Sequence, residues 1–268
     1  MVGLSSLLGR YEQVIVDLDG CVWIGDQAVD GSVEAIAALR EAGKRVAFAT
    51  NNSWHPGEDH VAKLWGLGIK ASLADVVTVG GALQHLLAET RSGRSAFVIG
   101  KESLRRHVAG AGLTVLNGTD LASRADTVVV GGTDDVTYDD LRNAALAVRR
   151  GADLLGTARD PTLPMPEGPW PGAGAILAAV ETASGTTASI VGKPRPQLFL
   201  TALDRLGEGP TLVVGDRLDS DVAAAAAAGL DAALVLSGGT TAEEAAAATD
   251  PRPVAVAETL GALVHGGG

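Results

Sequence analysis

The sequence has a single cysteine, few aromatic residues and a deficit of positive charge. Cys21 cannot form an intramolecular disulfide on its own, so a reducing compartment is expected. A net charge of -11 and a pI of about 4.8 argue against a broad surface for DNA or RNA. No apolar run reaches the roughly 18 residues of a membrane span, and residues 1–13 lack a signal-peptide pattern. We therefore expect a cytoplasmic protein that binds neither nucleic acid nor membrane.

Short apolar runs alternate with amphipathic segments along the 268 residues, which is the pattern of βαβ units around a parallel sheet. Hydrophobic residues make up 46% of the chain and charged residues 20%, a balance typical of a compact α/β protein. We expect strands at 13–18, 45–50, 76–79, 96–99, 113–116, 127–131, 153–157, 189–191, 211–215, 231–236 and 253–256. These are too many for one small sheet, so we expect one domain that carries an insertion.

Helices and one stiff loop are expected between these strands. Apolar spacing predicts helices over 33–43 and from His55-Pro56 to about residue 66, and the alanine run 223–228 predicts a closely packed helix. Segment 159–175 holds five of the eleven prolines, so we expect an irregular, stiff loop there. Such loops between domains often face a ligand.

Four short motifs follow predicted strands, where ligands bind in open parallel sheets. They are "DLDG" at 17–20, "TNNS" at 50–53, "GKPRP" at 192–196 and "GDRLDSD" at 215–221. Each motif alone also fits a turn, a helix cap or a surface lysine. Their occurrence together, each after a strand, predicts a single site.

Three aspartates of these motifs, Asp17, Asp19 and Asp216, would repel one another if they were close and ionised. A hard, oxygen-preferring dication such as Mg²⁺ removes this conflict, because carboxylates, waters and a substrate phosphate are its usual ligands. With a metal present, Asp17 is the candidate nucleophile on phosphorus, since it ends the strand. Asp19 is the candidate general acid and base.

A transferred phosphoryl group also needs hydrogen-bond donors for its oxygens. The hydroxyl of Thr50, the amides of Asn51 and Asn52, and the ammonium of Lys193 are the candidates. Pro194 restricts the backbone that presents the lysine.

The four motifs together resemble the haloacid dehalogenase superfamily of aspartate-nucleophile phosphotransferases. "TNNSWHPGEDHVAKLWGLGI", "GTARDPTLPMPEGPWPGAGAI" and "GKPRPQLF" are similar to one branch, the capped p-nitrophenylphosphatase-like (class IIA) phosphatases. The resemblance implies a Rossmann-like core built from residues 1–79 and 188–268. It implies an α/β cap over residues 80–187, inserted between the second and third motifs.

The resemblance also implies roles for single residues. Asp17 would become an aspartyl phosphate, and Asp19 would protonate the leaving group and then activate water. Mg²⁺ would be held by the Asp17 carboxylate, the Asp19 carbonyl and Asp216, with Asp221 supporting the metal shell. Dehalogenase chemistry is disfavoured, because those members lack a carboxylate at the position of Asp19.

Two positions depart from the family pattern. Cys21 stands where many members have threonine after the glycine of the first motif, and we interpret it as a packing residue. Leu163 stands where pyridoxal-phosphate phosphatases of this branch have a ligand-holding histidine, which disfavours pyridoxal phosphate. The five histidines show no metal-ligand spacing.

The cap loop from Ala158 to Pro171 would select the substrate. The candidates to touch the leaving group are Arg159, Asp160, Met165, Glu167 and Trp170, although packing of the loop against the core explains each of them equally well.

These features predict an Mg²⁺-dependent phosphatase of small phosphate monoesters, such as sugar, polyol or glycerol phosphates. The alternatives are a nucleotide monophosphate phosphatase and a non-catalytic, metabolite-binding regulator on the same fold. A mutase is disfavoured, since no second phosphate-binding loop occurs in the predicted cap. The resemblance further implies a homodimer formed through the cap.

Overall fold

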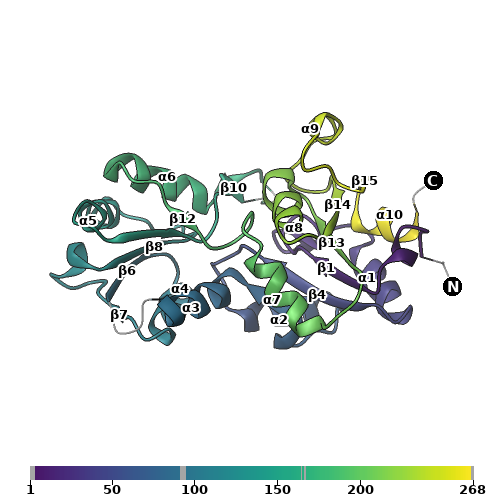
Figure 1. Ribbon diagram of the computed structural model, residues 1–268, viewed down its shortest axis with the longest axis horizontal. Coiled ribbons are helices and arrows are strands. Elements are labelled where there is room, and N and C mark those ends of the chain that lie inside the picture. The colour runs from purple at the N-terminus through teal and green to yellow at the C-terminus, as the bar shows by residue number, and fades with distance from the viewer. Residues whose placement is uncertain (1–3, 91–94, 164, 166, 267–268) are drawn as a thin grey trace.

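The computed structural model describes residues 4–90, 95–163, 165 and 167–266, and it contains two parallel sheets at opposite ends of the molecule (Figure 1). The six-stranded sheet has the order β15-β14-β13-β1-β4-β5. Its strands are β1 (Gln13–Val16), β4 (Arg45–Thr50), β5 (Val76–Thr78), β13 (Thr211–Gly215), β14 (Asp231–Val235) and β15 (Ala255–Ala257). We call this sheet and its helices the first lobe.

The five-stranded sheet has the order β12-β9-β8-β6-β7, and with its helices it forms the second lobe. Its strands are β6 (Ser95–Ile99), β7 (Thr114–Val115), β8 (Thr127–Val130), β9 (Asp153–Gly156) and β12 (Ser189–Ile190). Because β6 to β12 all come between β5 and β13, the second lobe is an α/β unit inserted into a Rossmann-like α/β fold. β12 lies beyond the expected end of the insertion at residue 187, so we propose that the inserted unit extends to Ile190.

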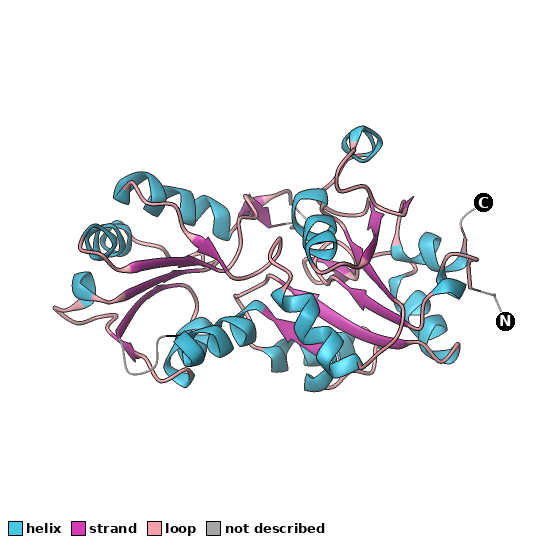
Figure 2. Ribbon diagram, viewed as in Figure 1, coloured by secondary structure: helices cyan, strands magenta, loops and turns pink. Residues whose placement is uncertain are grey.

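Helices cover both faces of each sheet (Figure 2), which explains why the middle residues of the central strands are apolar and buried on both faces. The helices of the first lobe are α1 (Ser32–Glu41), α2 (Gly57–Gly66), α7 (Gln197–Leu206), α8 (Ala223–Ala227), α9 (Ala242–Ala247) and α10 (Leu260–His265). The helices α3 (Val79–Thr90), α4 (Glu102–Gly110), α5 (Tyr138–Arg149) and α6 (Ala173–Ser184) accompany the second sheet. Single-turn helices lie at Leu8–Arg10, Leu73–Asp75 and Ala122–Arg124, and a π-helical turn at Leu218–Val222.

The side chains of β1 alternate between two buried layers. Val14 and Val16 pack with α1, α2 and α10, whereas Ile15 faces α7 and α8. The layer that contains Ile15 continues through α3 and α4 to Val98 and Val129 of the second sheet. A continuous apolar core therefore joins the two lobes on this side.

All the expected strands are present, with ends that differ by at most two residues from the expected ones. Two hairpins were not expected, namely β2 (Trp23–Ile24) with β3 (Gln27–Ala28), and β10 (Thr162–Leu163) with β11 (Trp170–Pro171). The expectation of an irregular loop over 159–175 is therefore wrong in part, because a two-residue antiparallel ladder tolerates a proline at its edge. Pro164 and Pro166 of this segment lie outside the described residues. Within the described parts of the chain, no helix has the length and apolarity needed to cross a bilayer.

Candidate active site

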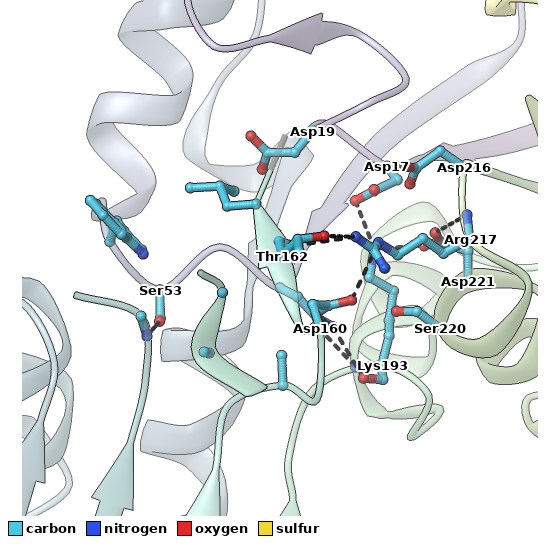
Figure 3. Close-up of a pocket in the computed structure, with 17 residues that line it drawn as sticks. Asp17, Asp19, Ser53, Asp160, Thr162, Lys193, Asp216, Arg217, Ser220 and Asp221 are labelled. Atoms are coloured by element: carbon cyan, nitrogen blue, oxygen red, sulfur yellow. Dashed lines mark hydrogen bonds and ion pairs between the residues drawn. The ribbon is translucent and has the colours of Figure 1, made fainter. Parts of the chain in front are cut away.

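The candidate site lies at the carboxyl ends of β13, β1 and β4, which are neighbours in the sheet. Asp17 follows β1 directly, Thr50 ends β4, and Asp216 follows β13. The backbone N–H of Asp17 still donates to the carbonyl of Val214 at 2.8 Å, so its position is fixed by the sheet ladder. Parallel pairing therefore brings three of the motifs to one edge (Figure 3).

The fourth motif supplies Lys193, which is 3% exposed and reaches this edge from the chain just after β12. Its Nζ lies 2.6 Å from an oxygen of Asp17 and 2.6 Å from an oxygen of Asp221. Burial alone would lower the pKa of Lys193, but these two carboxylates outweigh it and raise the pKa above the ordinary value. The ammonium is therefore a permanent positive charge between two acids.

Asp17 and Asp216 are buried acids whose charged forms are disfavoured. Burial raises the pKa of Asp17 well above its ordinary value; Lys193 opposes the shift, and the charges of Asp221 and Asp216 add to it. Burial and the charge of Asp221 raise the pKa of Asp216 to about 7, although the N–H of Gly239 donates to its carboxylate at 2.6 Å. A cation beside these two groups would stabilise their ionised forms.

The donors at this point fit a hard dication. Single ligand atoms of Asp17, Asp216 and Cys21 lie within 4.8 Å of one another. Burial, with Asp216 and Asp17 nearby, raises the pKa of the Cys21 thiol, so it stays protonated and is a poor ligand. The two carboxylates are the oxygen ligands that Mg²⁺ prefers. The carboxylate of Asp216 can lie close to the backbone of the first motif only because residue 20 is glycine, since a Cβ there would lie 2.5 Å from that carboxylate.

Three hydrogen bonds hold the carboxylate of Asp19 at the mouth of the site. The indole Nε1 of Trp23 donates to it at 2.9 Å, the hydroxyl of Thr50 at 3.4 Å and the amide of Asn52 at 3.3 Å. The Trp23 ring is stacked on the His60 ring with an interplanar angle of 6°. The ammonium of Lys63 lies 4.5 Å from the centroid of the Trp23 ring. Asp19 is therefore positioned apart from the Asp17–Lys193 pair.

Asn51 binds protein groups in this structure. Its carbonyl oxygen accepts from the N–H of Lys193 at 2.8 Å, and its amide donates to the Lys193 carbonyl and to the Asp160 carboxylate, both at 3.1 Å. The side chain of Asn51 thus joins the second motif to the third. Asn52 accepts from the N–H of Trp54 at 2.9 Å and so shapes the turn after β4.

The five cap-loop candidates are not all placed at the site. Arg159 binds Glu181 at 2.8 Å inside the second lobe and does not line the active-site cavity. Asp160 lines that cavity, and Met165 lines a neighbouring cavity. Trp170 pairs with Leu163 in the β10–β11 hairpin, and neither Trp170 nor Glu167 lines either cavity.

Arg217 and Trp23 are site residues that the sequence analysis did not single out. The guanidinium of Arg217 donates to the carbonyl and the hydroxyl of Thr162, both at 3.2 Å, and lies 3.6 Å from Asp160. The position of Arg217 directly after Asp216 was the signal that could have identified it. Trp23 lies four residues after Asp19, in the segment that leads out of the first motif.

Residues of all four motifs, with Asp160 and Thr162 of the second lobe, line a cavity of about 70 Å³, which we call the inner cavity and which is drawn in Figure 3. The first motif contributes Asp17 and Asp19 to its lining, the third contributes Lys193, and the fourth contributes Asp216. An acid fixed against a lysine, a second acid held apart and a third acid able to bind a cation are the groups that phosphoryl transfer needs.

Comparison with known proteins shows which family the chain resembles. Residues 14–114 match the family model of haloacid dehalogenase-like hydrolases, and residues 190–263 match a second, HAD-hydrolase-like model. A D-glycerol 3-phosphate phosphatase of Mycobacterium tuberculosis is 38% identical over 228 residues, which cover 85% of this chain. The chain spans 63% of the length of that relative.

One further relative and one solved structure are matched over most of their length. An acid sugar phosphatase of Staphylococcus aureus is 33% identical, with 85% of it and 83% of this chain covered. The crystal structure of a Mycobacterium tuberculosis glycerol phosphate phosphatase in complex with magnesium has a TM-score of 0.87 and 37% identity, covering 97% of this chain and 78% of that one. The chain belongs to the haloacid dehalogenase-like hydrolases, in their capped p-nitrophenylphosphatase-like branch.

Proposed function

We propose that the chain is an Mg²⁺-dependent phosphatase of small phosphate monoesters, with sugar, polyol or glycerol phosphates as its substrates. The observation that carries the proposal is the convergence of Asp17, Asp19, Lys193 and Asp216 on one cavity. The names of the phosphatase relatives support the substrate class.

In the first step, a carboxylate oxygen of Asp17 attacks phosphorus, and the bond from phosphorus to the ester oxygen breaks. Asp19 gives its proton to that leaving oxygen, so an alcohol departs and an aspartyl phosphate remains. Lys193 stabilises negative charge on Asp17 and on the phosphoryl oxygens, together with Thr50 and the backbone of the second motif.

In the second step, Asp19 takes a proton from water while the water oxygen attacks phosphorus. The bond between phosphorus and Asp17 breaks, which releases inorganic phosphate and restores both acids. Mg²⁺ would be held by Asp17, the Asp19 carbonyl and Asp216, with Asp221 behind them, and would neutralise charge on the phosphoryl group. The bond from Lys193 to Asp221 fixes that supporting acid.

The test is phosphate release from p-nitrophenyl phosphate and a panel of sugar, polyol and nucleotide monophosphates, with Mg²⁺ or with EDTA. We expect turnover of small monoesters with Mg²⁺ only, and none by Asp17→Asn. Turnover confined to nucleotide monophosphates would show that these, and not sugar, polyol or glycerol phosphates, are the substrates. Binding of metabolites without any turnover would indicate a regulator and would contradict the proposal.

A cytoplasmic location and a homodimer formed through the second lobe are further proposals. The first is supported by the single cysteine, Cys21, and the second by the branch to which the chain belongs. Gel filtration with light scattering tests the dimer.

A further inference from the structure

A second cavity of about 600 Å³ adjoins the inner cavity, and we call it the outer cavity. Asp19, Trp54 and Leu163 line both cavities, whereas Asp17, Lys193 and Asp216 line the inner one only. An inner cavity of about 70 Å³ has room for a phosphoryl group and little more. The outer cavity has the volume usual for a whole small-molecule ligand.

The position of Asp19 indicates which part of the substrate lies in the outer cavity. Asp19 would protonate the ester oxygen, so the leaving group must begin next to its carboxylate. With phosphorus beside Asp17 in the inner cavity, the leaving group extends past Asp19 into the outer one. Its walls come from both lobes, with Asp26, Asp59 and Lys63 on one side and Lys101 and Asp134 on the other.

The positive charges of the outer cavity are already paired. Lys63 lies 3.5 Å from Asp26, donates to the carbonyl of Gly25 at 2.5 Å and lies over the Trp23 ring. Lys101 forms an ion pair with Asp134 and lies 5.3 Å from a ring centroid of Trp54.

Acids outnumber bases on these walls. Among the described residues that line the outer cavity, three acids besides the proton donor Asp19 oppose two lysines, namely Asp26, Asp59 and Asp134. The imidazole of His55, which also lines it, is paired with Asp59 at 3.4 Å. A second anionic group on the substrate would therefore enter a negative region in which both ammonium groups already have carboxylate partners, and it would be repelled.

We propose that the outer cavity binds the leaving group and selects an uncharged polyhydroxyl group over one that carries a carboxylate or a second phosphate. Hydroxyl groups suit its walls, because they can donate hydrogen bonds to the carboxylates of Asp59 and Asp134. A carboxylate can only accept, and both lysines are already engaged. This selectivity rests on the proposed phosphatase activity.

The test compares esters that differ by one carboxylate. Glycerol 3-phosphate and 3-phosphoglycerate form one pair, and glucose 6-phosphate and 6-phosphogluconate form a second. We expect kcat/KM to be about tenfold or more higher for the uncharged member of each pair. Equal values, or a preference for the carboxylated member, would overturn the inference while p-nitrophenyl phosphate turnover still supports the phosphatase. Absence of turnover with every ester would overturn both.

One variant locates the selectivity in this cavity. Asp134→Asn removes an acid and leaves Lys101 with only the longer contact of 3.9 Å to Asp135. The ratio of kcat/KM between the two members should therefore shift about fivefold towards the carboxylated one. The matched control is Asp139→Asn, an exposed acid of the second lobe that is paired with Arg142 at 3.1 Å and lines neither cavity. An unchanged ratio in Asp134→Asn, or the same shift in the control, would contradict the assignment.

Discussion

At the scale of single residues, the site depends on acids that the fold holds in unequal surroundings. Asp17 is fixed against Lys193, while Asp19 is held by Trp23, Thr50 and Asn52. Two carboxylates that are separated by one residue can therefore have different roles, nucleophile and proton donor.

We expect Trp23 to position Asp19, because its indole donates to the Asp19 carboxylate. Replacing Trp23 by phenylalanine removes the indole donor at 2.9 Å and keeps most of the ring. We expect kcat for alkyl phosphates to fall about tenfold, and less for p-nitrophenyl phosphate, whose leaving group needs less protonation. The control is Trp65→Phe, which alters a tryptophan that is 56% exposed. Equal losses with both substrates would mean that Trp23 does not act through Asp19.

The raised pKa of Asp216 predicts how stability depends on pH. The pKa is about 7 in the folded protein and 3.8 ordinarily, so the folded state binds the proton more tightly. Metal-free protein should therefore lose stability as pH rises from about 4 through 7, by about 5 °C in Tm. Mg²⁺ should raise Tm more at pH 8 than at pH 5.5, because it binds the ionised acid.

The measurement is thermal unfolding in EDTA and in Mg²⁺ at both pH values. Asp216→Asn is the comparison, since it should flatten the pH dependence of the metal-free protein. A wild-type Tm that rises with pH relative to Asp216→Asn would contradict the assigned direction of the shift.

At the scale of elements, the turn after β1 requires glycine at position 20. Gly20 has φ of 88°, and a Cβ there would lie 2.5 Å from the Asp216 carboxylate. Gly43→Ala is the matched control, with φ of 75° and no heavy atom within 4 Å of the added Cβ. In urea unfolding, we expect Gly43→Ala to lower the unfolding free energy by about 1 kcal/mol and Gly20→Ala to lower it by at least about 2 kcal/mol. Gly20→Ala should also lose Mg²⁺ binding. Equal losses of unfolding free energy in the two variants would contradict the close contact between position 20 and the Asp216 carboxylate.

Elements with a strong periodic or apolar pattern could be predicted, and the shortest ones could not. The apolar runs of β1, β4 and β13 identify them as buried strands, and the motifs that follow them were correctly placed at one sheet edge. The β2–β3 and β10–β11 hairpins have only two residues in each strand, too few to show alternation. Their hydrogen bonds depend on contacts that a local pattern does not contain.

The same limit applies to side-chain partners in the site. The residue types at Asp17, Asp19, Lys193 and Asp216 predict the chemistry, because each follows a strand. The direction of Arg159, which turns to Glu181, depends on the packing of α6 and could not be inferred from a loop composition.

At the scale of the whole molecule, Arg217 links the fourth motif to the second lobe. It binds Thr162 and lies near Asp160, both of which belong to the inserted unit. We expect Arg217→Ala to raise KM about tenfold for all substrates with a smaller change in kcat, because the second lobe closes the cavity less firmly.

The control for this variant is Arg205→Ala. Arg205 donates to carbonyls of Leu73, Ala74 and Val76, so its bonds stay within the first lobe. An unchanged KM in Arg217→Ala, or an equal increase in the control, would show that the link between the lobes does not contribute to substrate binding.

The central claim is that Asp17 is the nucleophile of a phosphatase, and acid-quenched single turnover tests it most directly. Wild-type protein mixed with p-nitrophenyl phosphate and Mg²⁺, then digested and analysed by mass spectrometry, should show a phosphorylated peptide with the group on Asp17. Asp17→Asn should show neither this peptide nor turnover. Full turnover by Asp17→Asn, or a phosphoryl group on another residue, would contradict the account.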